Sequence, residues 1–220
     1  MPDITLYFAN GACSLASHIL LEETGVPYKA VRMHLTPRGV ESVDGTISHE
    51  AYCKIHHAGL VPALAVDGEV ITESIAILGF IASLKPEKHW EGKTAIERAK
   101  VYQWLSWTVG TLHGLAYGMM LRPDRVSVNP DDNPKIREKG RGVVHAAYTR
   151  IDKALVDREF LVGDSDTLAD FYLVPFWHWA GRNDIDMSPY PNYTRLVKRI
   201  EAKETAARAL KNESVTPADR

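Results

Sequence analysis

The sequence has few of the features that mark secreted or membrane proteins. Cys13 and Cys53 are the only cysteines in 220 residues, which excludes a disulfide framework and favours a reducing compartment. No apolar run is long enough to span a bilayer. The first residues lack the basic stretch and apolar core of a signal peptide. We therefore expect a cytoplasmic protein with no membrane association.

Strong charge and nucleotide-binding motifs are also missing. The formal net charge is -2, which gives no attraction to nucleic acid or to anionic lipid. Neither a Gly-x-Gly-x-x-G segment nor a P-loop occurs, so no nucleotide is indicated. What is present is ordinary for a folded chain, with 45% hydrophobic and 25% charged residues. The length suffices for one large domain or two small ones.

The first part of the chain alternates short strands with helices. Apolar runs and turn residues predict strands over residues 4–8, 28–33, 62–66 and 69–72, and helices over 14–24, 48–57 and 74–84. Asp67-Gly68, between the last two strands, is typical of a tight hairpin. The predicted order is β-α-β-α-β-β-α.

After a polar segment that contains Pro86 and Gly92, only helical patterns follow. They predict helices over residues 95–121, 136–156, 171–179 and 194–209. We therefore divide the chain into an α/β domain, a linker, an all-helical domain and a tail that we expect to be disordered. The boundaries are residues 1–84, 85–93, 94–211 and 212–220.

Two dipeptides stand at junctions between the predicted elements. Val61-Pro62 directly precedes the third strand, and Glu73-Ser74 opens the third helix. A cis bond before proline costs only ~0.5–1 kcal/mol, so a turn can hold it. A helix N-terminus carries unpaired N–H groups and partial positive charge, and it binds anions readily. Taken alone, Ser74 would be a helix cap.

Together with Gly-Ala-Cys-Ser-Leu at residues 11–15, this layout resembles the cytosolic glutathione transferases over nearly the whole chain, with the bacterial beta class nearest. The resemblance implies a thioredoxin-like α/β domain followed by an all-α domain. It implies a cis Val61-Pro62 bond, with the cysteinyl part of glutathione paired to the Val61 backbone. It also implies that Ser74 holds the γ-glutamyl carboxylate and that Glu73 holds the α-amino group.

The start of the first helix is the predicted site of the chemistry. Cys13 and Ser14 lie where free N–H groups lower the pKa of a thiol, and the same field would hold the thiolate of glutathione. The resemblance makes both residues catalytic candidates, Cys13 through a mixed disulfide or direct contact and Ser14 through its hydroxyl. A buried, inert Cys13 remains open. Tyr7 is either a pocket residue or part of the core, and Asn10 replaces a usual proline and could donate to the sulfur.

A histidine on the long fourth helix is a further feature that the resemblance singles out, and His113 matches it. Helical spacing puts Ser106, Gly110, His113 and Tyr117 on one stripe, which we interpret as a wall of the electrophile pocket. A core histidine is the alternative for His113. Arg38, in the loop after the second strand, is the candidate for the glycine carboxylate of glutathione.

Thr167-x-x-Asp170 has the pattern of a helix-capping box, worth about 1 kcal/mol. Such a box is usually accompanied by an apolar residue just before the cap, but Asp166 stands there. We therefore expect the box alone to fix this helix start.

A metal site is the competing interpretation of one short segment. His49, Cys53, His56 and His57 are all potential zinc ligands. Three ligands on one helical face rarely complete a tetrahedron, and no further cysteine is present, so we expect no metal.

These observations predict an enzyme that uses glutathione as a co-substrate and attacks a small apolar electrophile. We expect a homodimer, as is usual in the family. Detoxification is the expected setting of such a transferase. A glutathione-dependent cis-trans isomerase, as a tailoring enzyme of secondary metabolism, is the first alternative. A non-catalytic glutathione-binding protein and a thiol–disulfide oxidoreductase that acts through Cys13 are the others.

Overall fold

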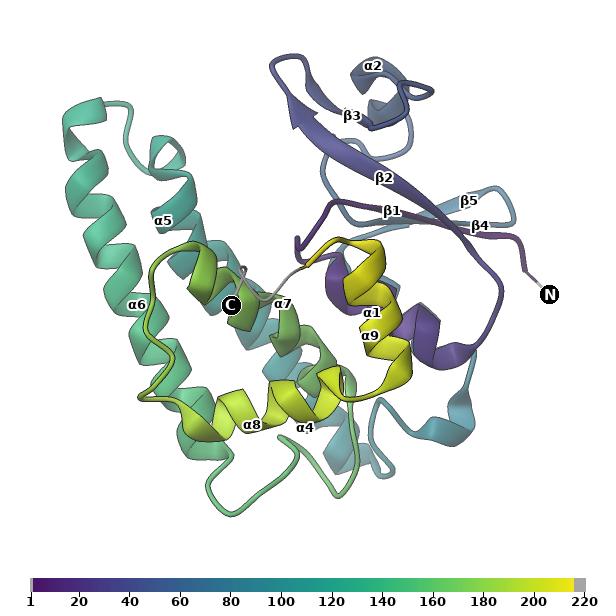
Figure 1. Ribbon diagram of the computed structural model, residues 1–220, viewed down its shortest axis with the longest axis vertical. Helices are drawn as coiled ribbons and strands as arrows, with labels where there is room; N and C mark the ends of the chain where they lie inside the picture. The colour runs from purple at the N-terminus through teal and green to yellow at the C-terminus, as the bar shows by residue number, and fades with distance from the viewer. Residues whose placement is uncertain (1, 216–220) are drawn as a thin grey trace.

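The computed structural model describes residues 2–215 and contains a five-stranded mixed sheet in the first part of the chain (Figure 1). The strand order is β3-β2-β1-β4-β5, in which β1 is parallel to β2 and the other neighbours are antiparallel. This topology confirms the predicted thioredoxin-like sheet. The strands are β1 Ile4–Phe8, β2 Lys29–Thr36, β3 Gly39–Ser42, β4 Ala63–Val66 and β5 Glu69–Thr72.

The hairpin of β2 and β3 replaces the polar loop that we expected after the second strand. Its turn is closed by Thr36, whose hydroxyl accepts from the Arg38 N–H at 3.1 Å and donates to the Gly39 carbonyl at 3.0 Å. The hairpin projects from the body of the molecule, at the top of Figure 1. Arg38 therefore lies at an exposed tip.

The helices of this first part are α1 Leu15–Thr24, α2 His49–Cys53 and α3 Ser74–Ser83. α1 packs against α3, and both contact the helix α7, Leu168–Arg182, of the second part. α1 is buried on most of its sides, which explains why its sequence is apolar around the helix rather than along one stripe. It ends at Gly25, whose positive φ of 64° suits a glycine.

The second part is helical, as predicted. Its main helices are α4 Ala95–Trp107, η2 Thr108–Tyr117, α5 Gly118–Leu121, α6 Asn133–Ala154, α7 Leu168–Arg182, α8 Pro191–Glu201 and α9 Glu204–Asn212. Short 3-10 turns are η1 Pro86–Lys88, η3 Pro123–Arg125 and η4 Pro130–Asp132.

Two of the predicted helices differ from those observed. The helix over residues 95–121 is continuous, but its middle, η2, is a π-helix, in which each N–H bonds five residues back. The helix over residues 194–209 is two helices, α8 and α9, which are separated at Ala202-Lys203.

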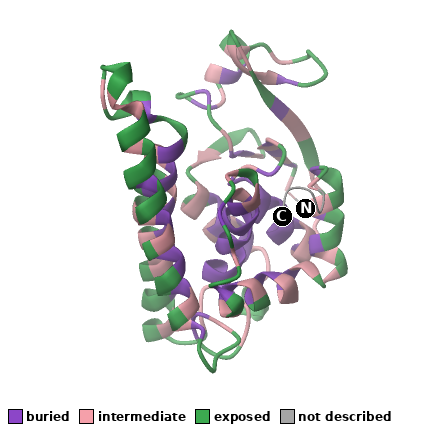
Figure 2. Ribbon diagram, turned by 60° about the vertical axis from the view of Figure 1, so that its left-hand side comes forward, coloured by how far each residue is buried: buried purple, intermediate pink, exposed green. Residues whose placement is uncertain are grey.

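The core of the helical part is built around α7. Every residue of α7 from Leu168 to His178 is buried, and Figure 2 shows this buried segment at the centre of the molecule. α7 contacts α1, α3, α4 and α8. Within residues 2–215, no helix combines the length and apolar character needed to cross a membrane.

The start of α7 is fixed by the predicted capping box and by a second contact. The buried Asp170 carboxylate accepts from the N–H and hydroxyl of Thr167, each at 2.8 Å, and from the Leu161 N–H at 2.9 Å. Asp166 pairs with Arg199 and Lys203, each at 2.6 Å. The expectation that the box acts alone was therefore wrong, because an ion-pair cluster takes the place of the missing apolar contact.

The chain end also differs from expectation. α9 runs to Asn212, and the Glu213 side chain after it is fully buried. The predicted disorder of residues 212–220 is therefore wrong for 212–215, and residues 216–220 lie outside the described part. α9 packs along α1, so the end of the chain returns to the first helix (Figure 1).

We predict that Asp170→Ala lowers the free energy of unfolding by about 3 kcal/mol, because three buried donors lose their acceptor. Thr167→Ser keeps the hydroxyl that donates to the carboxylate and should cost less than about 1 kcal/mol. Urea unfolding followed by circular dichroism measures both. An Asp170→Ala protein as stable as the parent would show that the box does not hold α7.

Candidate functional site

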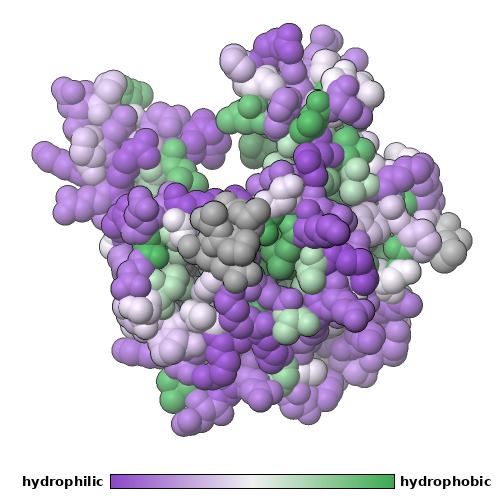
Figure 3. Space-filling model, in the orientation of Figure 1, coloured by the Kyte–Doolittle hydropathy of each residue, from purple (hydrophilic) through white to green (hydrophobic). Residues whose placement is uncertain are grey.

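The candidate site is a cavity of about 210 Å³ between the sheet domain and the helical part. The β1–α1 loop, the segment before β4 and the start of α3 form one side, and η2 and α7 form the other. In the space-filling view, the molecule is hollowed between the lobe of α5 and α6 and the lobe of β2, β3 and α2 (Figure 3). The cavity is lined by Cys13, His56, Ala58, Leu60, Val61, Pro62, Glu73, Ser74, Ile75, Val109, His113 and Tyr172.

The β1–α1 loop brings Cys13 to this cavity. Gly11 has a positive φ of 57°, and the Ala12 N–H donates to the Ala9 carbonyl at 3.1 Å, which turns the chain tightly after β1. The Cys13 thiol donates to the Val61 carbonyl at 3.6 Å. The loop and the segment before β4 are thereby joined at the sulfur atom.

The electrostatics at Cys13 differ from expectation. Burial raises the pKa of its thiol to about 11, although the Ser74 hydroxyl and the N–H groups of Cys13 and Ser14 lower it. The predicted lowering of the Cys13 pKa was therefore wrong, because desolvation of the thiol of this buried residue outweighs these donors. Cys13 carries its proton at neutral pH and acts as a hydrogen-bond donor.

Ser14 does not line the cavity. It is fully buried, and its hydroxyl accepts from the Ala9 N–H at 3.2 Å and donates to the Ala9 carbonyl at 3.3 Å. A direct contact of this hydroxyl with a bound sulfur is therefore not supported, because both of its bonds serve the loop. What Ser14 presents near the sulfur is its backbone N–H.

The start of α3 and the segment before β4 meet as the resemblance implies. The Val61-Pro62 bond is cis, and Val61 lies directly before β4. Ser74 is the first residue of α3, so the free N–H groups of the helix point toward the cavity. Glu73 precedes it with a positive φ of 70° and an exposed side chain. A hydroxyl, a helix N-terminus and a carboxylate thus stand together at one end of the cavity.

His113 faces the cavity from η2. Burial lowers its pKa to about 4, so the ring is neutral at pH 7. The Tyr172 hydroxyl lies 3.3 Å from its Nδ1. Burial raises the pKa of Tyr172 far above its ordinary value, so this hydroxyl stays protonated and donates to Nδ1, which leaves the His113 proton on Nε2.

The other members of the predicted stripe do not line this cavity. Ser106 and Gly110 are exposed, whereas Tyr117 is buried and bonds to the Tyr148 hydroxyl and the Phe176 carbonyl. The prediction assumed α-helical spacing, and the wider turn of the π-helix rotates Tyr117 into the core. Val109 takes the place beside His113.

Three further predicted residues lie outside the cavity. Arg38 is bonded to both oxygens of Glu41, at 2.8 and 2.9 Å, at the tip of the hairpin. Asn10 is exposed in the β1–α1 loop. Tyr7, on β1, is half-buried with its ring 5.7 Å from that of Tyr52. None of the three is among the lining residues of the cavity in the described chain.

Two polar cavity residues, Tyr172 and His56, escaped the sequence analysis as site candidates. Tyr172 lies inside the apolar run after the capping box, where nothing distinguishes it from a core residue. His56 was considered as a metal ligand, not as a residue of this cavity. Its Nδ1 accepts from the Ala58 N–H at 3.2 Å, and burial lowers its pKa, so a neutral ring with its proton on Nε2 faces the cavity.

The potential zinc ligands point in different directions. Cys53 Sγ lies 3.5 Å from His49 Nε2, while His56 stacks on His57 with ring centres 5.3 Å apart. Within residues 2–215, no group of three His, Cys, Asp or Glu side chains is arranged to hold a metal.

Comparison with known proteins connects this geometry to one family. The family model for the glutathione S-transferase N-terminal domain matches residues 2–83, and the model for the C-terminal domain matches residues 117–204. The chain is 30% identical to glutathione S-transferase GST-4.5 of Xanthomonas campestris, covering 96% of this chain and 98% of that protein. It is 28% identical to maleylacetoacetate isomerase of Dictyostelium discoideum, covering 86% and 84%.

A solved structure agrees with these sequence matches. The beta-class glutathione S-transferase of Sphingomonas chungbukensis superposes with a TM-score of 0.83 at 32% identity, covering 96% of this chain and all of that one. The likeness to the beta class is therefore confirmed.

We predict that Cys13 reacts slowly with iodoacetamide at pH 7. With a pKa of about 11, only about one thiol in ten thousand is ionised at that pH, and the rate should rise about tenfold for each pH unit up to about 11. The Cys53→Ser variant isolates the reaction of Cys13, and mass spectrometry of its time course measures the rate. Labelling of Cys13 within minutes at pH 7 would contradict the buried thiol.

Proposed function

Because the chain belongs to the glutathione S-transferase family, we propose that it conjugates the thiolate of glutathione to an apolar electrophile. The observation that carries this proposal is the cavity at which Cys13, Val61 and Ser74 meet below His113 and Tyr172. Glutathione is a co-substrate here, and the chemistry needs no metal.

The tripeptide would bind along the sheet-domain side of the cavity. The γ-glutamyl carboxylate would accept from the Ser74 hydroxyl and the N–H groups that open α3, where the helix dipole favours an anion. The Glu73 carboxylate would hold the α-amino group, and the Val61 backbone would pair with the cysteinyl residue. His56, with its proton on Nε2, is a neutral donor at the same side and would bond to the peptide there, whereas Arg38 lies outside the cavity.

The sulfur of glutathione would lie beside Cys13. The N–H groups of Cys13 and Ser14 and the Cys13 thiol are donors there, and donors favour the ionised form of a bound thiol. In the reaction the glutathione thiol releases its proton, its electron pair forms a C–S bond, and a leaving group departs or a double bond accepts the addition. His113, with its proton on Nε2, stands ready to donate to the developing charge on the electrophile.

The opposite side of the cavity is suited to an apolar substrate. Val109 supplies apolar surface on that side and the His113 ring is neutral, while Ile75 and Leu60 add apolar surface from the sheet-domain side. Glu73, at the far end, is the one acidic or basic side chain, histidines aside, among the lining residues of the described cavity. Selection by shape and apolar contact therefore fits this wall better than selection by charge.

A glutathione-dependent isomerase is the second candidate, and the match to maleylacetoacetate isomerase favours it. The same thiolate would add to a conjugated double bond, allow rotation about the resulting single bond, and leave again, so that glutathione is regenerated. A thiol–disulfide exchange role for Cys13 is disfavoured, since the thiolate is the attacking form and the pKa of Cys13 is about 11.

We also propose a two-fold homodimer in the cytoplasm that acts in detoxification or in secondary metabolism. The two family-model matches support a glutathione-binding domain over residues 1–84 and a helical domain over residues 94–211. Light scattering on the purified protein tests the dimer.

We predict that Ser74→Ala raises the KM for glutathione about tenfold or more, because a hydrogen bond to a carboxylate is lost. Ser83→Ala is the matched control, since Ser83 lies at the other end of α3 and donates to the Phe80 carbonyl at 2.6 Å. Initial rates at varied glutathione concentration measure both. Equal KM values for the two variants would place the carboxylate elsewhere.

We predict that turnover consumes one glutathione for each product formed. Free thiol and product are counted over time with a panel of apolar aromatic halides and conjugated enones. Loss of thiol in step with thioether identifies a transferase. Product formation at constant thiol identifies the isomerase instead.

A further inference from the structure

The chain end carries a buried carboxylate that the chemistry above does not use. Glu213 follows α9 directly, and its side chain has no exposed surface. Its Oε1 lies 2.8 Å from Nδ1 of His18, and its Oε2 accepts from the Gly11 N–H at 2.7 Å. A buried carboxylate is costly unless both oxygens are bonded, and here both are.

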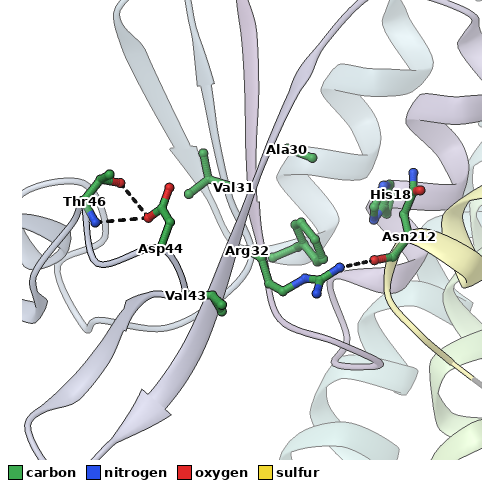
Figure 4. A pocket seen from close by; sticks show the side chains of 9 residues that line it. His18, Ala30, Val31, Arg32, Val43, Asp44, Thr46 and Asn212 are labelled. Carbon is green, nitrogen blue, oxygen red and sulfur yellow. Dashed lines mark hydrogen bonds between the residues drawn. The ribbon is translucent and has the colours of Figure 1, made fainter.

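The surroundings of this carboxylate hold it firmly in place. His18, from α1, lies between the rings of Phe8 and Tyr28, at centroid distances of 4.9 and 5.9 Å. Arg32 of β2 donates to the carbonyl of Asn212, the residue before Glu213. Figure 4 shows Arg32 reaching across a cavity toward Asn212, beside His18. The second strand, α1 and the β1–α1 loop therefore all bond to Asn212 or Glu213.

Gly11 forms hydrogen bonds through both its N–H and its carbonyl. While its N–H donates to Glu213, its carbonyl accepts from Trp179 Nε1 at 2.7 Å and from Arg182 Nη1 at 3.1 Å. A Cβ on Gly11 would lie 2.1 Å from the Arg182 guanidinium, and the φ of Gly11 is positive. The backbone at Gly11 is thus fixed from α7 on one side and from the chain end on the other.

Gly11 lies two residues before Cys13. The N–H groups of Cys13 and Ser14, which bond to the Cys13 sulfur, belong to the same short loop, and the proposed function places the glutathione sulfur beside that atom. The Ser14 hydroxyl fixes the loop at Ala9, and Glu213 fixes it at Gly11. These donors therefore share their loop with a backbone N–H that is held by a side chain more than two hundred positions along the chain.

We infer that Glu213 is a positioning residue for the reaction: its hydrogen bonds to Gly11 and His18 hold the β1–α1 loop so that the N–H groups of Cys13 and Ser14 face the glutathione sulfur. This inference rests on the proposed function. The residue after α9 thus has a positioning role, whereas the sequence alone predicts a disordered tail from residue 212 onward.

The charge of Glu213 and its positioning role predict opposite shifts in the pKa of a bound thiol when Glu213 is replaced. The negative charge of Glu213 raises the pKa of the nearby Cys13 thiol and would raise that of a bound thiol in the same way. Removing the charge alone would therefore lower the thiol pKa. Misplacing the N–H donors would raise it, because the thiolate loses its partners. The groups facing Glu213 are His18, Arg182 and Tyr28, and those facing the sulfur are Cys13, His113 and Tyr172.

The test compares two substitutions at one position. Glu213→Gln keeps an oxygen that accepts from the Gly11 N–H. Its amide N–H₂ can donate to His18 Nδ1 if the His18 ring proton moves from Nδ1 to Nε2. Nε2 is buried and has no hydrogen-bond partner in the described structure. Glu213→Ala removes both bonds. Arg208→Ala is the matched control, because Arg208 joins α9 to Glu22 of α1 at 2.7 Å without touching the loop.

The readouts are the pKa of enzyme-bound glutathione, from its thiolate ultraviolet absorbance against pH, and kcat/KM. Glu213→Ala should raise the pKa of the bound thiol by about 1 and lower kcat/KM about 10- to 100-fold. Glu213→Gln should stay within about threefold of the parent. Arg208→Ala should leave the thiol pKa unchanged, even if the melting temperature falls.

Three results would overturn the inference. A lower thiol pKa in both Glu213 variants would show an effect of charge alone. An unchanged thiol pKa in Glu213→Ala, with only a lower melting temperature, would show a purely structural clamp, as would equal changes in Arg208→Ala and Glu213→Ala. A parent protein that binds no glutathione would instead refute the proposed function.

Discussion

The burial of α7 between the sheet domain and the other helices is the constraint on which the rest of the structure depends. One face of this helix packs into the core. The other face lines the cavity with Tyr172 and bonds to the Gly11 carbonyl through Trp179. Because α7 is apolar on nearly every side, its start cannot be set by amphipathicity and must be set by polar contacts. The buried Asp170 and the ion pairs of Asp166 provide them. Stability and the geometry of the site therefore share one helix.

Desolvation decides the chemistry at the sulfur. The same enclosure that keeps water from the cavity raises the pKa of Cys13, lowers that of His113 and keeps Tyr172 protonated. At pH 7 these three side chains are therefore neutral hydrogen-bond donors, and none is a protein thiolate or a charged group. Neutral donors favour a bound thiolate without competing with it as nucleophiles. This arrangement suits a protein in which the ligand supplies the reactive sulfur.

The sequence predicted those parts of the site that depend on neighbouring residues and missed those that depend on residues far apart in the chain. The turn at Val61-Pro62 and the helix start at Ser74 were placed correctly because both are fixed by a few adjacent residues, while their binding roles came from the family resemblance. Tyr117 was misplaced because a π-helical segment changes the spacing without a signal in residue types. Arg38 was misplaced because an unpredicted hairpin removes it from the cavity. Glu213 was missed because its partners lie at the opposite end of the chain, where no local pattern can indicate them.

Conjugation and isomerisation differ only after the thiolate has added to its substrate, so a single cavity can serve both. The distinguishing factor is whether the adduct carries a group that departs or a bond that can rotate and expel sulfur again. The first outcome needs product release, whereas the second needs the adduct to remain enclosed until the carbon–sulfur bond breaks. A cavity of about 210 Å³ holds little more than the reacting groups of such an adduct. Under the proposed function, the remainder of a larger substrate would lie outside this cavity, and the residues there, rather than those at the sulfur, would set which electrophile is accepted.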